Sequence, residues 1–443
     1  MYETSLTSLE TRVLNRISED RWLKLASELI RTGQPRSGNP LDPDMPGGEE
    51  EAIAMLTAGK LEAMGMSVQT YSDVPGRPNV VGVMKGTGEG PSLMMNDHLD
   101  TYPVVEPEKW TMTDGKPYEA KRHGDLLYAR GTSDTRGNMA SCLLAAQALI
   151  EEGVTFEGDL IYCFCVDEER DGTHGSIYLT EKVGIRADYS ITAEPTAWGG
   201  PVNPDSSGAL PDWGINLSVA NSGHCLVEIE VTGEKGHIWR PDVIVNPITK
   251  AATLLPLLEQ MTFTHEADPF PGHTPPCTTV VRIRGGLEGE MQFSPDTCVI
   301  TLAVVGIVPG MTMESILADI SAVSRSVTEG SNRLALKVRQ VPGSLFVEAT
   351  SPVPLDEEPC LSLVKQSERL LGQTPEPNRK NAFNDTIRLR EAGMNSVTFG
   401  PGEDGWAADN EWISITKSVA AAKIYALTIM DILQVSNKAE LGE

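Results

Sequence analysis

The chain has 443 residues, of which 40% are hydrophobic and 22% are charged, and its formal net charge is −26. This length and composition are typical of a globular protein with two or three domains and a large core. The acidic charge argues against nucleic acid or an anionic membrane as a partner, and no run of 18 apolar residues predicts a membrane span.

Residues 1–30 predict an amphipathic helix and not a secretory signal, because charged side chains interrupt every apolar stretch. The seven cysteines are scattered, and the closest pair, Cys163 and Cys165, lies in an apolar run typical of a buried strand. We therefore expect a cytoplasmic protein whose thiols are reduced and packed in the core.

Helices and strands are expected to alternate through the first half of the chain. Residues 50–66 have helical periodicity, and residues 129–153 predict a loop followed by a helix. Apolar runs predict strands at 79–86, 91–97, 159–169 and 187–196. This alternation is typical of an α/β fold in which helices cover both faces of the sheet.

A second domain is expected after the connection 199–223, which is rich in Pro, Gly and Asn. The segments that follow predict strand, helix, strand, strand, helix and strand, at 225–233, 246–261, 278–286, 296–307, 312–327 and 334–341. This order is the ferredoxin-like α+β pattern. We expect an inserted domain at residues 216–342, while residues 1–215 and 343–443 form the first domain.

Acidic side chains and a histidine follow the predicted strands of the first domain. They are His98, Asp100, Asp134, Glu168, Glu169 and Glu194. The carboxyl ends of strands are where such sheets gather ligands and catalytic groups. Each position alone also fits a solvated turn, but the same chemistry at several strand ends indicates a site. One imidazole with several carboxylates suits a divalent ion such as zinc, cobalt or manganese.

The spacing of these residues suggests which of them bind metal, orient the histidine or transfer a proton. His98 and Asp100 are two apart in an extended segment, so both point to one face, and Asp100 can hold the far ring nitrogen of the histidine. Glu168 and Glu169 are adjacent and therefore diverge. One of them can bind a metal while the other takes a proton from metal-bound water.

The chain resembles a known family in six motifs that occur in order: HLDTYPV, ARGTSDTRGNMA, VDEERDGTHGS, AEPT, VTGEKGHIWRPDVIVNP and VTFGPGEDGW. The family is that of the dinuclear metallohydrolases, which groups aminoacylases, carboxypeptidase G, succinyl-diaminopimelate desuccinylases and acetylornithine deacetylase. The resemblance covers nearly the whole chain. It implies a zinc-exopeptidase-like catalytic domain on a mixed sheet, an inserted lid, and hydrolysis of an amide bond in a small molecule by metal-bound water.

The resemblance also implies a role for each residue of the strand ends. His98 and Glu194 match ligands of a first metal, Glu169 matches a ligand of a second metal, and Asp134 matches the carboxylate that bridges the two. Glu168 matches the general base. The orienting partner of the histidine falls on Asp100, and a cis peptide bond is implied between Asp134 and Thr135.

In the expected lid, His237 matches a histidine that reaches into the site of a partner subunit and stabilises the oxyanion. The resemblance therefore implies a homodimer formed through the lid. From the residues alone, His237 also fits a surface histidine in a turn after a strand.

The chain departs from the family at the final metal ligand, which is a histidine shortly after the GPG loop. Aligned on Asn410 and Glu411, that position is Ala407, and the last histidine of the chain is His273. Asp409 or a water molecule can substitute. Otherwise the site holds one metal on His98, Asp134 and Glu194, and we expect one tightly bound divalent ion per chain.

The lid departs from the family too, at the asparagine and arginine with which many members bind substrate. Gln292 and Gly306 stand at the matching positions, so the arginine that grips a substrate carboxylate is missing. Arg240, Arg282 or Arg284 can replace it, although each also fits an ordinary surface or strand arginine.

The leading hypothesis is a metal-dependent hydrolase of a C–N bond, acting on an N-acyl amino acid or small peptide. An alternative is an aminohydrolase that releases ammonia from an aromatic amine, as 5-nitroanthranilate aminohydrolase does in the same family. Trp239 and Trp406 would suit a flat substrate, although either can serve packing. A catalytically inactive binding protein is the third possibility, which Ala407 favours and the retained Glu168 opposes.

Overall fold

The computed structural model describes residues 6–33, 47–196, 214–268, 270, 272, 274–289, 292–328, 331–402 and 407–436. The chain divides into two compact units. The first consists of Met1–Val219, Val353–Asn378 and Asn384–Glu443, and the second of Ala220–Pro352 with Arg379–Phe383. The sequence placed the inserted segment at 216–342, so the second unit begins four residues later and ends ten residues later than expected, and it also takes up a short return segment.

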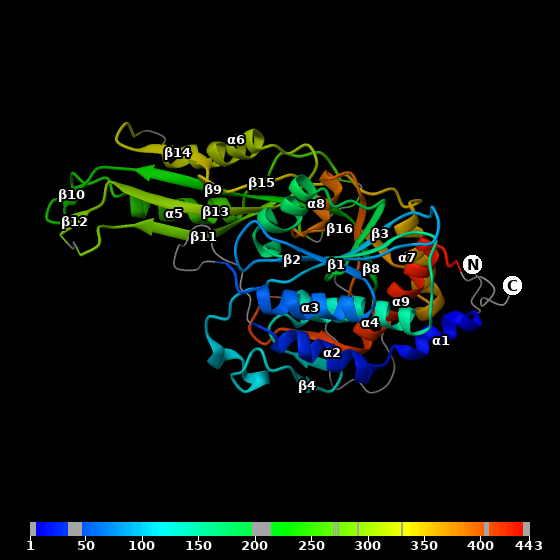
Figure 1. Ribbon diagram of the computed structural model, residues 1–443. Coiled ribbons are helices and arrows are strands. Elements are labelled where there is room, and N and C mark those ends of the chain that lie inside the picture. Colours follow the sequence, from blue (N-terminus) through cyan, green and yellow to red (C-terminus); the bar gives the residue numbers. More distant parts are fainter. Residues whose placement is uncertain are drawn as a thin grey trace. The chain divides into compact units, whose positions relative to one another are not determined.

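An eight-stranded sheet forms the centre of the first unit, in the order β1-β2-β6-β3-β7-β17-β8-β16 (Figure 1). Its strands are β1 (Ser67–Tyr71), β2 (Asn79–Met84), β3 (Leu93–His98), β6 (Leu160–Cys165), β7 (Tyr189–Thr192), β8 (Asn216–Asn221), β16 (Glu376–Lys380) and β17 (Asn395–Thr398). β3 runs parallel to β6 and β7, and β17 runs parallel to β7. β1 and β2 pair in antiparallel fashion, as do β2 and β6. The sheet is therefore mixed.

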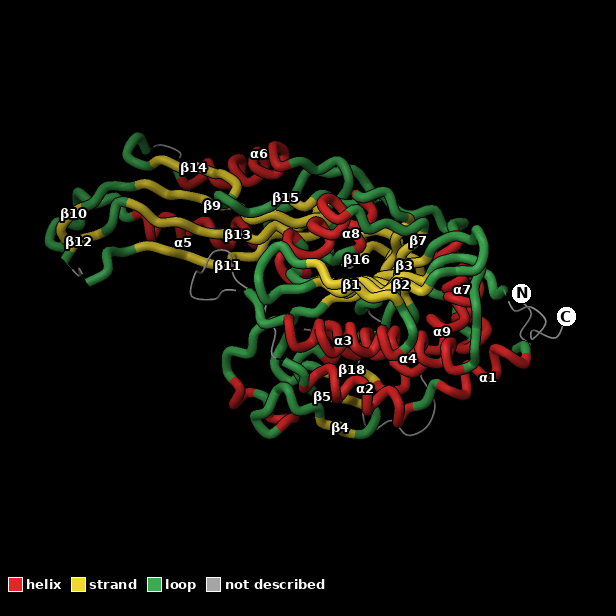
Figure 2. The backbone as a smooth tube through the Cα atoms, in the orientation of Figure 1, coloured by secondary structure: helices red, strands yellow, loops and turns green. Residues whose placement is uncertain are grey.

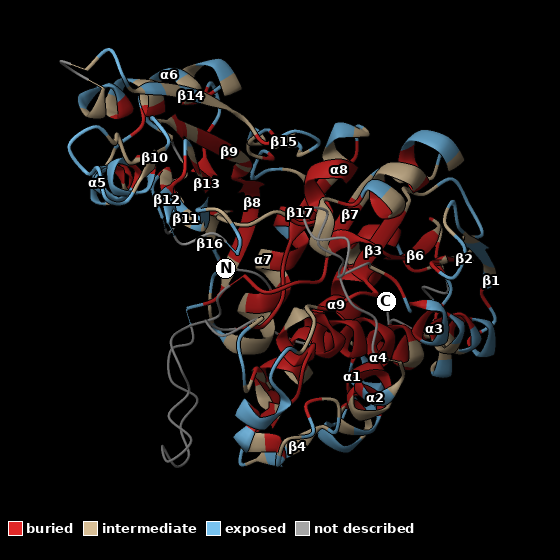
Figure 3. Ribbon diagram, turned by 90° about the vertical axis from the view of Figure 1, so that its left-hand side faces the viewer, coloured by how far each residue is buried: buried red, intermediate tan, exposed pale blue. Residues whose placement is uncertain are grey.

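Helices cover both faces of this sheet. The helices of the first unit are α1 (Ser8–Arg16), α2 (Glu19–Arg31), α3 (Glu51–Ala63), α4 (Gly137–Glu151), α7 (Glu358–Leu371), α8 (Thr386–Glu391) and α9 (Ile415–Leu433). Figure 2 shows α3, α4 and α9 along one face and α8 on the opposite side. Every residue of β3 and of β6 is buried as a result, and Figure 3 shows the same for most of α4 and α9. The α/β expectation is confirmed.

The first unit also contains a small three-stranded sheet in the order β18-β5-β4. Its strands are β4 (Lys121–His123), β5 (Leu126–Tyr128) and β18 (Trp412–Ser414). Because β18 pairs with β5, it brings a segment near the end of the chain next to the loop that follows β5. That loop leads into α4 and carries Asp134.

The second unit has a four-strand path in the order β11-β13-β9-β14, all of it antiparallel. Its elements are β9 (Gly223–Thr232), β10 (Gly236–His237), α5 (Pro247–Glu259), β11 (Cys277–Gly285), β12 (Phe293–Ser294), β13 (Thr297–Ile307), α6 (Met313–Ser324), β14 (Ala335–Gln340) and β15 (Phe346–Val347). Alternate residues of β9, among them Val227 and Ile229, pack with α5 and α6 in one core. The ferredoxin-like order is confirmed.

All seven cysteines lie within the described residues and are free, and each is buried except Cys277, which is partly exposed. Among the helices of the described ranges, none has the length and apolar character needed to cross a bilayer.

Candidate metal centre

The parallel strands of the first unit end at one edge of the sheet, where they deliver the acidic residues. His98 is the last residue of β3, Glu168 and Glu169 form a short turn after β6, and Glu194 follows β7. Asp134 lies in the turn Thr132–Arg136 that precedes α4. The parallel register of β3, β6 and β7 brings the ends of these strands to the same edge.

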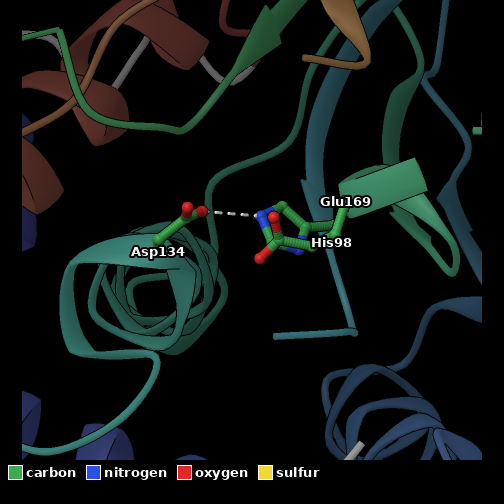
Figure 4. Close-up of side chains that lie close together, drawn as sticks. All are labelled: His98, Asp134 and Glu169. Atoms are coloured by element: carbon green, nitrogen blue, oxygen red, sulfur yellow. Dashed lines mark hydrogen bonds and ion pairs between the residues drawn. The ribbon is translucent and has the colours of Figure 1, made fainter. Parts of the chain in front are cut away.

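His98 lies at the centre of the group. Its ring is fully buried, and its Nε2 atom is 3.0 Å from Oδ1 of Asp134 and 3.8 Å from Oε2 of Glu168. One ligand atom from each of His98, Asp134 and Glu169 lies within 4.8 Å of the others. Figure 4 shows the carboxylate of Asp134 directed at the imidazole, with Glu169 beside it. This is the spacing that a shared cation requires.

The donor set fits a divalent cation. It offers one imidazole nitrogen and carboxylate oxygens, which zinc, manganese and cobalt accept. In the described part of the chain, Oε1 of Glu169 is buried and has no hydrogen-bond partner. A buried carboxylate oxygen without a donor is costly unless something positive is bound to it. The residues therefore match a bound metal better than a closed network of hydrogen bonds.

The buried carboxylates of this site repel one another, and burial together with this repulsion shifts the pKa values of the group. Burial and the nearby charge of Glu194 raise the pKa of Glu168 well above its ordinary value. Burial and the charge of Asp134 do the same to the pKa of Glu169. Burial lowers the pKa of His98, but the carboxylates of Glu168 and its neighbours outweigh burial and raise that pKa well above its usual range. So much negative charge in a buried place is what a divalent cation neutralises.

Asp100 faces the ring of His98 with two of its groups. Nδ1 of His98 faces the main-chain oxygen of Asp100 at 3.0 Å, while the Asp100 carboxylate is 3.5 Å away. That carboxylate accepts hydrogen bonds from the backbone N–H groups of Glu168 and Glu169, each at 3.2 Å. A single residue thus orients the imidazole through its carbonyl and holds the glutamate turn through its side chain.

Glu194 is buried, with 3% of its surface exposed. It lies near enough for its charge to raise the pKa of Glu168. Within the described residues, however, the converging group consists of His98, Asp134 and Glu169 and does not include Glu194. The peptide bond between Asp134 and Thr135 is cis, as the resemblance implied.

Ala407 is the residue to which the resemblance assigns the missing histidine, and in the structure its carbonyl contacts an arginine. Its backbone is in the left-handed region at φ 62°, and its carbonyl accepts a hydrogen bond from Nη2 of Arg130 at 3.0 Å. Asp409, the expected substitute, is exposed and does not belong to the converging group of the described residues. Trp406 lies outside the described residues.

His237 lies in the second unit, at the end of the short strand β10, which pairs with β12. Its ring packs edge-on against Phe293, with 5.0 Å between the ring centroids. The backbone N–H of Trp239 donates to Nδ1 of His237 at 3.3 Å. Because Nδ1 accepts, the proton of the neutral ring is on Nε2, which is therefore free to act as a donor.

Buried charged residues that the sequence analysis did not assign support the centre. Arg77 bonds to Glu50 through Nε at 3.0 Å and to Asp167 through Nη1 at 3.0 Å, and Asp167 immediately precedes Glu168. Glu411 accepts backbone hydrogen bonds from the loop that carries Asp134. Asp167 lies within a motif of the resemblance and Glu411 within the segment aligned with the final metal ligand, but the spacing of the motifs does not reveal these contacts. The one signal in the sequence for such a support was an arginine or glutamate within a short apolar or turn-forming stretch.

Comparisons with known proteins give the same answer as the geometry. The model of Peptidase family M20/M25/M40 matches residues 94–431. N-formyl-4-amino-5-aminomethyl-2-methylpyrimidine deformylase of Bacillus subtilis is 27% identical over 398 residues, which cover 86% of this chain and 89% of that protein. Succinyl-diaminopimelate desuccinylase of Hydrogenovibrio crunogenus is 24% identical over 78% of this chain and 85% of its own length.

Among solved structures, human carnosine dipeptidase 1 superposes with a TM-score of 0.74. The match covers 97% of this chain and 100% of that one at 15% identity, which supports the fold. The family match spans most of the chain and confirms the resemblance found in the motifs. This chain therefore belongs to Peptidase family M20/M25/M40 and is a metallohydrolase that acts on amide bonds.

Proposed function

We propose that the chain hydrolyses the amide bond of a small N-acyl compound, such as an N-acyl amino acid or a small peptide, with water activated at His98, Asp134 and Glu169. The observation that carries the proposal is the convergence of these three side chains within 4.8 Å beside the buried Glu168. A divalent cation held there would lower the pKa of a water molecule and polarise the acyl oxygen.

Glu168 is the proposed general base. Its backbone is fixed by the hydrogen bond to Asp100, and burial with the charge of Glu194 raises its pKa, which favours a carboxylate that can accept a proton. Glu168 accepts a proton from the attacking water as the new C–O bond forms. It then passes that proton to the amide nitrogen as the C–N bond breaks, so the products are a carboxylic acid and an amine.

His237 is the proposed oxyanion donor, supplied by a partner subunit in a homodimer formed through the second unit. The hydrogen bond from Trp239 to Nδ1 supports this role, because it leaves Nε2 protonated. The apolar side chains that follow the histidine support an interface. Ile238 is 51% exposed and Trp239 is 81% exposed, and adjacent apolar side chains of this size are typical of surfaces that a partner covers.

The arginine with which many family members grip a substrate carboxylate is missing here, so a substrate carboxylate, where there is one, is proposed to bind to other groups. Gly306 occupies that position with φ 71°, and a Cβ atom there would lie 3.0 Å from the carbonyl oxygen of Pro275. An arginine does not fit this backbone without movement. Arg240 pairs with Asp242 and Arg284 lies 3.5 Å from Glu228, so both already face carboxylates.

A short acyl group on a nitrogen of a small, flat molecule fits these constraints within the N-acyl class. The deformylase relative, whose name describes an N-formyl group on an aminopyrimidine, supports that choice. The absent arginine also favours the second candidate, an aminohydrolase that releases ammonia from an aromatic amine. Both candidates use the same proton transfers by Glu168.

One tightly bound ion per chain is the proposed metal content, with zinc, manganese or cobalt as candidates. An imidazole nitrogen with two carboxylates suits all three ions. Ala407 supports the lower count, because it withholds the imidazole that would bind a second ion.

The test begins with protein stripped of metal and reloaded with zinc, manganese or cobalt. Each form is assayed on N-formyl and N-acetyl amines, N-acyl amino acids, dipeptides and aromatic amines. We expect amide cleavage that depends on metal, with Glu168→Gln keeping the metal but losing about three orders of magnitude in rate. Ammonia release from an aromatic amine alone would establish the second candidate. No turnover of any substrate by fully loaded protein would identify a binding protein instead.

A further inference from the structure

The carboxylate of Glu411 lies beneath the loop that carries Asp134. Oε1 of Glu411 accepts hydrogen bonds from the backbone N–H groups of Ser133 at 2.8 Å and Asp134 at 3.0 Å. Oε2 accepts from the N–H of Gly131 at 3.0 Å and from Nη1 of Arg130 at 2.7 Å. Each carboxylate oxygen therefore has two donors, and three of the four donors belong to the backbone of one short loop.

The fold places this carboxylate by strand pairing. β18 begins at Trp412, which pairs with Tyr128 in β5. The backbone N–H of Ala129 donates to the carbonyl of Glu411 at 3.1 Å, which extends the pairing by one residue. Glu411 is thus fixed at the point where β5 ends and the loop begins. Its surface is 1% exposed, so water does not compete for its oxygens.

Arg130 fixes the other side of the same carboxylate. Its guanidinium lies over the ring of Trp110, 4.9 Å from the ring centroid, and Trp110 is fully buried. Nη1 of Arg130 bonds to Glu411, while Nη2 bonds to the carbonyl of Ala407. One arginine therefore ties both ends of the segment 407–411 to the loop.

We propose that Glu411 is a positioning residue for Asp134, and that the segment 407–411 serves this purpose although it lacks the histidine of its relatives. Asp134 has φ −125° and ψ 82° inside a turn that leads directly into α4, so no helix holds its backbone there. The bonds from Glu411 hold the backbone on both sides of Ser133 and fix the origin of the Asp134 side chain. The inference rests on the proposed function, because it assigns Glu411 to the metal centre.

The position of Asp134 matters because its Oδ1 faces Nε2 of His98 at 3.0 Å. A shift of the loop would change the distance between these two ligand atoms, and a metal site tolerates only small changes in such distances. Residues that orient ligands without touching the metal typically contribute 10–100-fold to metal affinity. A carboxylate with structural value alone would contribute to stability and leave that affinity unchanged.

The test compares Glu411→Gln with a matched control, Glu10→Gln. Glu10 is also buried in the first unit, accepts a backbone N–H from Thr7, and receives two hydrogen bonds from Arg369. Both variants remove one negative charge from a carboxylate bound to an arginine and to backbone. Zinc affinity is measured by competition with a chromophoric chelator, and the melting temperature of each metal-free variant is recorded alongside.

We expect Glu411→Gln to weaken zinc binding about 10–100-fold and Glu10→Gln to leave it within about twofold, although both melt at a lower temperature. Equal zinc affinity in Glu411→Gln and wild type would overturn the inference while leaving the proposed function intact. Failure of the wild type to bind zinc, manganese and cobalt would instead overturn the proposed function. If Glu411→Gln does not fold, Arg130→Gln replaces it, and unchanged zinc affinity in that folded variant would overturn the inference.

Discussion

Nη1 of Arg77 lies 3.0 Å from Oδ1 of Asp167, and both side chains are buried. Glu50 accepts from the same guanidinium and is fully buried. A loop between β1 and β2 thereby holds the residue that leads into Glu168 and Glu169. The turn of Glu168 and Glu169 is therefore supported by an ion pair from a distant part of the first unit, as well as by Asp100.

Arg77→Met should lower the free energy of unfolding by about 3–5 kcal/mol, because it leaves two buried carboxylates without their partner. Urea denaturation followed by circular dichroism measures the change. Lys116→Met is the matched control, since Lys116 and Glu119 form an exposed pair that is worth less than about 1 kcal/mol. An equal loss of unfolding free energy in the two variants would show that the buried ion pair stabilises the fold no more than the exposed pair does.

His98→Ala and Asp134→Ala should each release the metal, because each removes an atom of the converging group. Asp100→Asn should weaken binding about 10–100-fold, since its side chain fixes the glutamate turn and is not part of the converging group of the described residues. Elemental analysis after dialysis measures the first effect, and chelator competition measures the second. Full metal content in dialysed His98→Ala would refute the site.

The pair of Glu10 and Arg369 should make stability depend on pH. Burial alone would raise the pKa of Glu10, but the hydrogen bonds from Arg369 and Thr7 outweigh burial and lower it. A lowered pKa adds stability above the unfolded-state pKa of about 4.3, and that contribution is lost as the pH falls through the folded-state value. The difference in unfolding free energy between wild type and Glu10→Gln should be constant near neutral pH and shrink below about pH 4. A difference that stays constant into that range would contradict the assignment.

Subunit mixing tests the action of His237 on a partner's site. Glu168→Gln and His237→Ala should each be inactive or nearly so, the second by about 10²–10³ in rate. A mixed dimer has one site with both residues intact, so mixing the two variants should restore partial activity. Size-exclusion chromatography of differently tagged subunits establishes exchange. Exchange without recovered activity would argue that His237 acts within its own chain.

Ala407→His should raise the metal content from about one ion per chain towards two, since it restores an imidazole to the position that relatives use. The left-handed backbone of Ala407 does not prevent this, because histidine adopts that region more readily than most residues. Elemental analysis after extensive dialysis provides the measurement. Two ions in the wild type that survive a mild chelator would show that Ala407 does not limit metal binding.

The main elements of the fold could be predicted because their signals are local. The apolar runs of β3 and β6 are buried on both sides, and the alternation in β9 matches a sheet with one covered face. The converging residues could be found because parallel strands end at a common edge. The sheet β18-β5-β4 was not expected, since strands of three residues carry too little periodicity to be recognised.

The supports of the site could not be predicted, for a different reason. Glu411 bonds to backbone N–H groups, and a backbone donor is the same at every residue, so the sequence holds no record of the pairing. Asp100 was expected to face His98 with its carboxylate, which lies 3.5 Å from Nδ1, but the sequence did not predict the closer contact of its carbonyl at 3.0 Å. Whether a histidine nitrogen bonds to the carbonyl or to the carboxylate of the same residue depends on distances of a few tenths of an ångström, which a sequence pattern does not contain.

The loop that carries Asp134 and the carboxylate that holds it are 277 residues apart in the chain. Ribosomes add about 5–20 residues each second, so Asp134 emerges roughly 15–55 seconds before Glu411 does. α4 is likewise synthesised before α9, so it lacks this packing partner until α9 has been translated. During synthesis the acidic strand ends are therefore present without their final support. Metal uptake should follow translation of the segment that contains Glu411, and nascent chains arrested before it should bind zinc weakly.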